Sequence, residues 1–319
     1  MEKLVYQMFI LGEGICLEEA LGKGLGGVIF FTKDIPNEKI FKDKIVNFKD
    51  KAIISPFLSI DQEGGRVERT ENIRPKRLSP REVFKKGEKF LTEQAFEISK
   101  ELYDWGINLN FAPCADVNTN PNNPIIGERA FSDNPDDVIK GVEIFTEISQ
   151  RNGVIPCVKH FPGHGDADKD SHLTLPEIDL PFEEMRETHI KPFANAVKNS
   201  ADMVMVAHLW CKCFDKEIKP SSLSENVVGY LRNELKFNGV AISDDMVMKG
   251  VQKYGSFEAC KMGIDAGLDM FIYREANNEV INTINKLVEY AERNDDFRRK
   301  IIASNDRISK LKLKYGIIK

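Results

Sequence analysis

Short apolar segments alternate with amphipathic segments along nearly the whole chain, and this alternation restricts the fold more than any other feature. In the amphipathic segments apolar residues recur three and four positions apart, as on one helix face; Leu91, Ala95, Ile98 and Leu102 are an example. Strict alternation of strand and helix implies parallel strands joined by helical crossovers. Strands are predicted at residues 27–31, 57–60, 107–112, 154–158, 203–206, 239–245 and 268–273.

Polar side chains at the ends of these strands favour one of the two common parallel folds. They are Asp61, Asp116, Lys159 with His160, His208, and Asp244. An open sheet collects functional groups at a single switch point, whereas a barrel brings the ends of all its strands to one mouth. We therefore predict an α/β protein with a single (β/α)8 TIM-type barrel. It is expected to form one domain over residues 1–319, with C-terminal helices and no linker.

Composition excludes several classes of protein. The 319-residue chain has a formal net charge of −5, which argues against a broad basic surface for nucleic acid. No apolar stretch approaches the length of a membrane span, and the N-terminus lacks the apolar region of a signal peptide. Six cysteines are scattered rather than clustered, which favours buried thiols over a disulfide framework. We expect a cytoplasmic protein without a nucleic-acid or membrane partner, and no obligate protein partner is evident.

The loop after the strand at 154–158 concentrates ionisable side chains. It carries three of the protein's five histidines, and Pro162, Gly163 and Gly165 exclude regular structure. Asp170 and His172 are two positions apart, so on an extended segment they lie on the same side. A carboxylate in that position orients an imidazole and raises its basicity, which suits acid–base catalysis near neutral pH. A solvated loop with incidental charge is the alternative.

Other ionisable residues have simpler interpretations. Asp244 is either catalytic or a cap at its strand end, and Asp245 could fill the capping role instead. His164 is expected to bond the backbone and shape its loop. His189 lies in a polar helical stretch, where we expect it to be exposed.

Three motifs resemble cofactor or metal sites, but each departs from the pattern it suggests. A G-x-G-x-x-G match at 22–27 precedes a strand rather than following one, so a turn is the better interpretation. The acidic run at 166–170 has Ser171 where a calcium loop needs glycine. His160 and His164 are four apart, but Pro162 and Gly163 prevent the helix that zinc ligation would need, and Cys211-x-Cys213 lacks a second pair. No cofactor and no metal are predicted.

Several of these segments together resemble the β-N-acetylglucosaminidase branch of family 3 glycoside hydrolases. The signature is KHFPGHGD from residue 159 followed by DSH from residue 170. The resemblance extends to GVIFF from residue 27, DQEGGRV from 61, GERAF from 127 and SDDM from 243. It covers most of the chain, in the order of the family.

The resemblance implies a (β/α)8 barrel that removes terminal, non-reducing β-linked N-acetylglucosamine with retention of configuration. Position by position, it makes Asp244 the nucleophile and His172 the acid/base, paired with Asp170. It also implies that the sugar is held by Asp61, Arg69, Arg129, Lys159 and His160. Most retaining glycosidases use a carboxylic acid as the acid/base, and this branch is the exception with an Asp–His pair.

Two other functions remain open from the sequence. One is a phosphorylase, because a neutral histidine admits phosphate to the intermediate without the repulsion that a carboxylate would exert. The other is a barrel that binds wall-derived saccharides without catalysis, although the joint presence of Asp170, His172 and Asp244 argues against it. Relatives that act as β-glucosidases take their acid from a further domain, for which we expect no room after the barrel. The aglycone, a muropeptide or a chitin fragment, is also left open.

Overall fold

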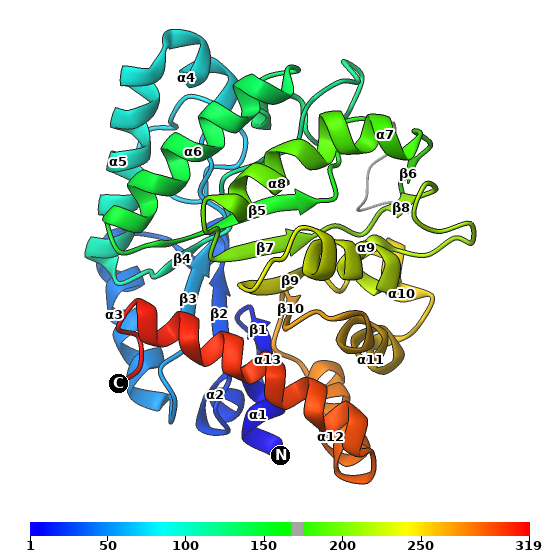
Figure 1. The fold of residues 1–319 in the computed structure, drawn as a ribbon. Helices are drawn as coiled ribbons and strands as arrows, with labels where there is room; N and C mark the ends of the chain where they lie inside the picture. Colours follow the sequence, from blue (N-terminus) through cyan, green and yellow to red (C-terminus); the bar gives the residue numbers. More distant parts are fainter. Residues whose placement is uncertain (168–174) are drawn as a thin grey trace.

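The computed structural model describes residues 1–167 and 175–319 and forms a closed barrel of parallel strands surrounded by helices (Figure 1). Around the barrel the strand order is β1-β10-β9-β7-β5-β4-β3-β2. The bounds are β1 Phe9–Leu11, β2 Gly27–Phe30, β3 Phe57–Ile60, β4 Leu109–Asn110, β5 Ile155–Phe161, β7 Met203–Val206, β9 Val240–Asp245 and β10 Met270–Tyr273. The predicted parallel α/β barrel is confirmed.

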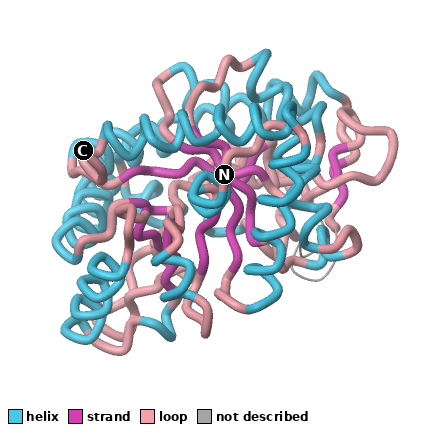
Figure 2. The backbone as a smooth tube through the Cα atoms, turned by 90° about the horizontal axis from the view of Figure 1, so that it is seen from below, coloured by secondary structure: helices cyan, strands magenta, loops and turns pink. Residues whose placement is uncertain are grey.

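Helices cover the outside of the barrel. Seen from below, the N-terminal end of the chain lies over the middle of the barrel (Figure 2). The helices are α1 Glu2–Gln7, α2 Leu17–Gly22, α3 Glu38–Lys51, α4 Pro80–Lys86, α5 Glu88–Trp105, α6 Pro135–Arg151, α7 Phe182–Glu184, α8 Lys191–Lys198, α9 Glu225–Gly229, α10 Lys249–Gln252, α11 Ser256–Ala266, α12 Asn278–Arg293 and α13 Asp295–Lys314. No helix in the described part of the chain has the length and apolar character needed to cross a membrane.

A small ribbon lies apart from the barrel. Its two parallel strands are β6, Glu177–Ile178, and β8, Trp210–Cys211, which belong to the loops after β5 and β7. Both loops leave the same end of the barrel, so the ribbon lies on the side of the mouth.

Two barrel strands differ most from the sequence prediction. β4 covers only Leu109–Asn110 rather than 107–112, because amide side chains replace part of its ladder: Asn108 Oδ1 accepts the Leu58 N–H, and Asn110 Oδ1 accepts the Gln62 N–H. β5 continues past 158 to Phe161, so Lys159 and His160 belong to the strand. The first strand, β1, was not predicted.

The structure shows a helix cap at Ser224 and confirms one local prediction. Ser224 caps α9 by accepting the Val227 N–H at 3.2 Å. The glycines at 22–27 form the turn between α2 and β2, where Gly24 has φ +92° and a Cβ on Gly26 would lie 2.0 Å from the Gln7 carbonyl oxygen. Only glycine fits that close approach.

The end of the barrel opposite the mouth, where the strands begin, contains a buried lysine. Lys312 of α13 is fully buried, and its Nζ donates to Gln7 Oε1 and to the Ser55 carbonyl, both at 2.9 Å. The Phe57 ring centroid is 4.9 Å from the ammonium. No carboxylate among the described residues bonds it, and burial lowers the pKa of Lys312 to about 7.

Replacing Lys312 with methionine is expected to flatten the pH dependence of stability on the alkaline side. The pKa of Lys312 is lowered on folding from 10.5 to about 7. Between those values the unfolded chain therefore binds one more proton at this site, and the free energy of unfolding rises with pH. That contribution, at most about 1.4 kcal/mol per pH unit, is absent from the variant. Urea unfolding from pH 7 to 10 measures it, with exposed Lys310→Met as the matched control. Parallel curves for wild type and Lys312→Met would contradict the assignment.

Candidate active site

The C-terminal ends of the barrel strands surround one cavity of about 380 Å³. This volume is in the range of small-ligand pockets. Among the residues that line it are Asp61, Arg69, Arg129, Lys159, His160 and Asp244. The structure therefore brings together every predicted site residue that it describes. Asp170 and His172 lie outside the described residues.

A buried network of opposite charges forms one wall of the cavity. The Lys159 ammonium contacts Asp61 Oδ1 and Glu63 Oε1, both at 2.7 Å. The Arg129 guanidinium forms a bidentate pair with the Glu63 carboxylate, with Nε at 2.9 Å and Nη2 at 2.8 Å. Arg69 approaches Asp61 at 3.9 Å. Each charge is compensated, which makes burial of the group tolerable.

The charges in this network hold one another in their ionised forms. Desolvation opposes ionisation of Glu63, but Arg129 and Lys159 outweigh it and keep its pKa well below the usual range. Desolvation likewise disfavours the Lys159 ammonium, yet Asp61 and Glu63 raise its pKa. The cavity wall therefore presents fixed charges at neutral pH.

A second buried carboxylate orients His160. Asp116 follows β4, and its Oδ2 lies 2.6 Å from His160 Nδ1. The backbone N–H groups of His160 and His164 also donate to Asp116, the latter at 2.6 Å. Desolvation opposes the charge on Asp116, but His160 and His164 hold its pKa well below the usual range. His160 Nε2 then lies 3.2 Å from Arg129 Nη2, at the cavity.

Asp244 presents its carboxylate to the cavity from β9. Desolvation opposes its ionisation, but the imidazoles of His160 and His208, the Asp245 N–H and Lys159 lower its pKa below the ordinary value. It is therefore an anion at neutral pH. The strand-end role falls to Asp245, which accepts the Val247 N–H at 3.2 Å and pairs with Arg274.

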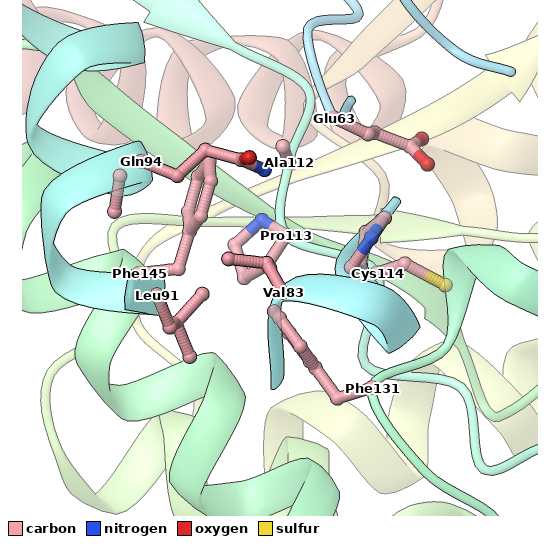
Figure 3. Close-up of a pocket in the computed structure, with 11 residues that line it drawn as sticks. Glu63, Val83, Leu91, Gln94, Ala112, Pro113, Cys114, Phe131 and Phe145 are labelled. Atoms are coloured by element: carbon pink, nitrogen blue, oxygen red, sulfur yellow. The ribbon is translucent and has the colours of Figure 1, made fainter. Parts of the chain in front are cut away.

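Glu63 lies at the edge of a small, mainly apolar pocket (Figure 3). Val83, Leu91, Phe131 and Phe145 line it, and in this view the Glu63 carboxylate points away from Leu91 and Phe145. Apolar packing on this side leaves Glu63 no water to solvate it, so its charge depends on Arg129 and Lys159.

Two predictions about histidines need correction. His189 is buried rather than exposed, because it lies in a π-helical turn, Met185–Ile190, that packs against Gly163. His164 does not bond the backbone through its ring: neither ring nitrogen has a partner among the described residues, and burial lowers the pKa of His164 to about 4. His208, one of the polar strand ends, is buried 2.6 Å from Ser222 Oγ, and its imidazole helps to lower the pKa of Asp244.

One group of side chains has the spacing of a metal site. Cys114, Asp116 and His160 offer ligand atoms within 4.8 Å of one another. However, Asp116 already accepts bonds from the Cys114 thiol and from His160, and the Arg129 cation lies beside His160. A second cation there would be repelled, so the group serves as a hydrogen-bond network. The absence of a cofactor stays a prediction.

Comparison with known proteins identifies the family. Residues 17–311 match the model of the glycosyl hydrolase family 3 N terminal domain. The chain belongs to glycosyl hydrolase family 3.

The family relatives are similar over most of this chain. It is 32% identical over 327 residues to beta-hexosaminidase A of Pseudoalteromonas piscicida, covering 91% of this chain and 53% of that protein. It is 29% identical over 304 residues to a beta-hexosaminidase of Haemophilus influenzae, covering 89% and 85%. A family 3 beta-N-acetylglucosaminidase structure from Paenibacillus sp. str. FPU-7 matches with a TM-score of 0.93 and 29% identity, over 99% of this chain and 63% of that one. The chain thus spans about half to two thirds of the length of two of these relatives.

Two residues of this family 3 site were not predicted as part of it. Glu63 lies two positions after Asp61, and its role as the shared partner of Lys159 and Arg129 appears only in the structure. Asp116 was recognised as a polar strand end but given no function. The signal that both share is an acidic residue next to an apolar strand, which is costly to bury without a partner.

Proposed function

We propose that this chain is a retaining β-N-acetylhexosaminidase that removes terminal, non-reducing β-linked N-acetylglucosamine from saccharides. The observation that carries the proposal is the anionic Asp244 carboxylate in the same cavity as a fixed set of charged, hydroxyl-binding side chains. The names of the relatives, beta-hexosaminidase and beta-N-acetylglucosaminidase, support the same substrate class. The barrel, residues 1–319, would act as one catalytic domain.

In the proposed mechanism Asp244 attacks the anomeric carbon of the bound sugar. The glycosidic oxygen leaves with a proton from His172, which Asp170 orients, and a covalent glycosyl-Asp244 intermediate forms. Water, deprotonated by the now neutral His172, then attacks the same carbon and releases the sugar with retained configuration. The low pKa of Asp244 keeps it ionised and therefore nucleophilic.

We propose that five side chains hold the sugar: Asp61, Arg69, Arg129, Lys159 and His160. Charged and bidentate hydrogen bonds to hydroxyl groups discriminate strongly in a site shielded from water, because a wrong sugar leaves buried polar groups unpaired. The fixed charges of Asp61 and Lys159 suit neighbouring hydroxyls, since one accepts and the other donates. No metal or redox cofactor is needed for any of these steps.

Product analysis tests the reaction. The chain is incubated with a β-linked N-acetylglucosaminyl disaccharide, and the first-formed anomer is recorded by NMR. The β-anomer of free N-acetylglucosamine supports the proposal, whereas the α-anomer would overturn retention. Added phosphate tests the alternative phosphorylase, which would yield N-acetylglucosamine 1-phosphate. Binding without turnover would instead indicate a saccharide-binding barrel.

The role of His172 predicts a dependence on the leaving group. His172→Ala is expected to slow hydrolysis by about 10²–10⁴-fold for a natural disaccharide, because the departing alkoxide needs a proton. The loss should be much smaller when the glycosyl-Asp244 intermediate is formed from an activated nitrophenyl glycoside, because its leaving group departs as a stabilised anion. A plot of rate against leaving-group pKa, for wild type and variant, measures the difference. Equal losses across the series would exclude His172 as the acid.

The biological setting belongs to the same proposal. We propose that the chain acts in the cytoplasm on saccharides from cell-wall recycling, namely muropeptides, with chitin-derived fragments as the alternative source. Turnover of matched disaccharides, one carrying a muramyl and one an N-acetylglucosaminyl aglycone, distinguishes the two. A higher kcat/KM for the muramyl compound would support wall recycling.

A further inference from the structure

Two thiols outside the saccharide cavity lie close enough to react with each other. Cys211 Sγ and Cys213 Sγ are 3.4 Å apart where β8 ends. The chain turns sharply at this point, because the N–H groups of Phe214 and Asp215 both donate to the Cys211 carbonyl, at 3.1 and 3.2 Å. The turn brings side chains two positions apart to the same place.

The surrounding structure fixes this arrangement on both sides of the turn. β8 is held to β6 by the Trp210 N–H to the Pro176 carbonyl at 2.8 Å and by the Lys212 N–H to the Ile178 carbonyl at 3.1 Å. After the turn, the Asp215 carboxylate accepts from Ser224 Oγ at 2.5 Å. The backbone that carries the two cysteines is therefore fixed on both sides of the turn.

The two cysteines have different environments. Cys211 is buried, whereas Cys213 is partly exposed; the other four, Cys16, Cys114, Cys157 and Cys260, are buried. The two sulfurs lie within hydrogen-bonding distance, and this contact lowers the pKa of Cys213 and raises that of Cys211. Thiolate character and access both favour attack by Cys213, and Cys211 is placed to resolve the product.

We propose that Cys211 and Cys213 form an oxidisable pair that reacts with hydrogen peroxide to give an intramolecular disulfide. In the first step the Cys213 thiolate attacks a peroxide oxygen and the O–O bond breaks, which gives Cys213 sulfenic acid and hydroxide; the hydroxide takes up the proton that the thiol had released and leaves as water. In the second step the Cys211 thiol attacks the Cys213 sulfur and displaces a second water. Overall, two thiols are oxidised to one disulfide and one peroxide is reduced to two waters.

The geometry also predicts that this disulfide is labile. The sulfurs need to approach by about 1.4 Å to reach the bond length of a disulfide. The bond would close a ring over a single intervening residue, Lys212, in a partly exposed turn. Strained or exposed disulfides are readily reduced, so the modification is reversible.

Mass spectrometry of the reduced full chain tests the proposal. One equivalent of hydrogen peroxide should decrease the intact mass by about 2 Da, with the crosslink mapped to the peptide that holds Cys211 and Cys213. Dithiothreitol should restore the original mass. A stable sulfinic acid on Cys213 beside a free Cys211, or earlier oxidation of any other cysteine, would overturn the proposal.

Variants separate the two roles. In Cys211→Ser the sulfenic acid on Cys213 persists and is trapped by dimedone, whereas Cys213→Ser should lose the fast reaction with peroxide by at least about tenfold. Cys16→Ser, at a buried thiol elsewhere, is the matched control and should form the disulfide as the wild type does. Fast oxidation of Cys213→Ser would contradict the assignment. The wild-type measurement stands alone if a variant does not fold.

Discussion

Replacing Asp244 with alanine is expected to lower kcat/KM on a nitrophenyl β-N-acetylglucosaminide by at least about four orders of magnitude. The carboxylate is the only candidate nucleophile proposed for the cavity, and without it the covalent route is closed. The nearby carboxylates of Asp61, Glu63 and Asp245 are already paired with Lys159, Arg129 or Arg274, so they are poorly suited to replace it.

The identity of the lost group is tested by chemical rescue. Azide is small enough to enter the space left by the missing carboxylate, and it attacks the anomeric carbon from the same face. Asp244→Ala with azide should therefore yield the α-glycosyl azide, detected by NMR, at a restored rate. Asp306→Ala, at an exposed aspartate of α13, is the matched control and should keep wild-type activity. Retention of more than about a tenth of the activity by Asp244→Ala would exclude a nucleophilic role.

Replacing Glu63 with glutamine is expected to lower both stability and activity. The amide leaves Lys159 and Arg129 without the shared carboxylate that bonds both, and it presents N–H groups to cations. Removing one partner from a buried ion pair costs about 3–5 kcal/mol. Displacement of Lys159 and Arg129 should lower kcat/KM by about 10²–10³-fold. Urea unfolding and steady-state kinetics measure the two effects.

The pH dependence distinguishes loss of charge from loss of shape. The pKa of Glu63 is depressed on folding, so its contribution to stability is complete above the unfolded pKa of about 4.3 and decreases as the pH falls below it. The stability difference between wild type and Glu63→Gln should therefore shrink in acid. Glu289→Gln, the same change at an exposed site on α12, should show neither effect. A difference that stays constant with pH would indicate a packing defect instead.

The fold was predictable because its signals are local. Seven apolar segments correspond to barrel strands, but β1 was missed since Phe9–Leu11 is too short to show a pattern. β4 was predicted too long because the sequence does not reveal that Asn108 and Asn110 side chains replace backbone pairing. Such substitutions depend on neighbouring strands and cannot be inferred from one segment.

The sequence allowed us to predict which residues lie together in the site. It did not allow us to predict which of them form ion pairs or hydrogen bonds with one another. Strand ends of a barrel converge by geometry, so Asp61, Lys159 and Asp244 were expected to share one mouth. That Lys159 bonds Glu63 as well as Asp61 depends on the bend of the chain after β3. His189 was misjudged because a π-helical turn changes which face of a segment is buried, and helix periodicity assumes a regular helix.

The charged network that joins β3, β5 and the loop bearing Arg129 is held together by contacts within the protein itself. Ordering these side chains is part of the folding equilibrium, so a ligand encounters a template that is already set and loses little conformational entropy in organising it. Selectivity at such a template arises from mismatch, since a ring with a misplaced hydroxyl meets charges that cannot move to accommodate it. We therefore expect that the leaving group of a substrate can vary widely without loss of turnover, whereas the sugar ring that is cleaved off cannot.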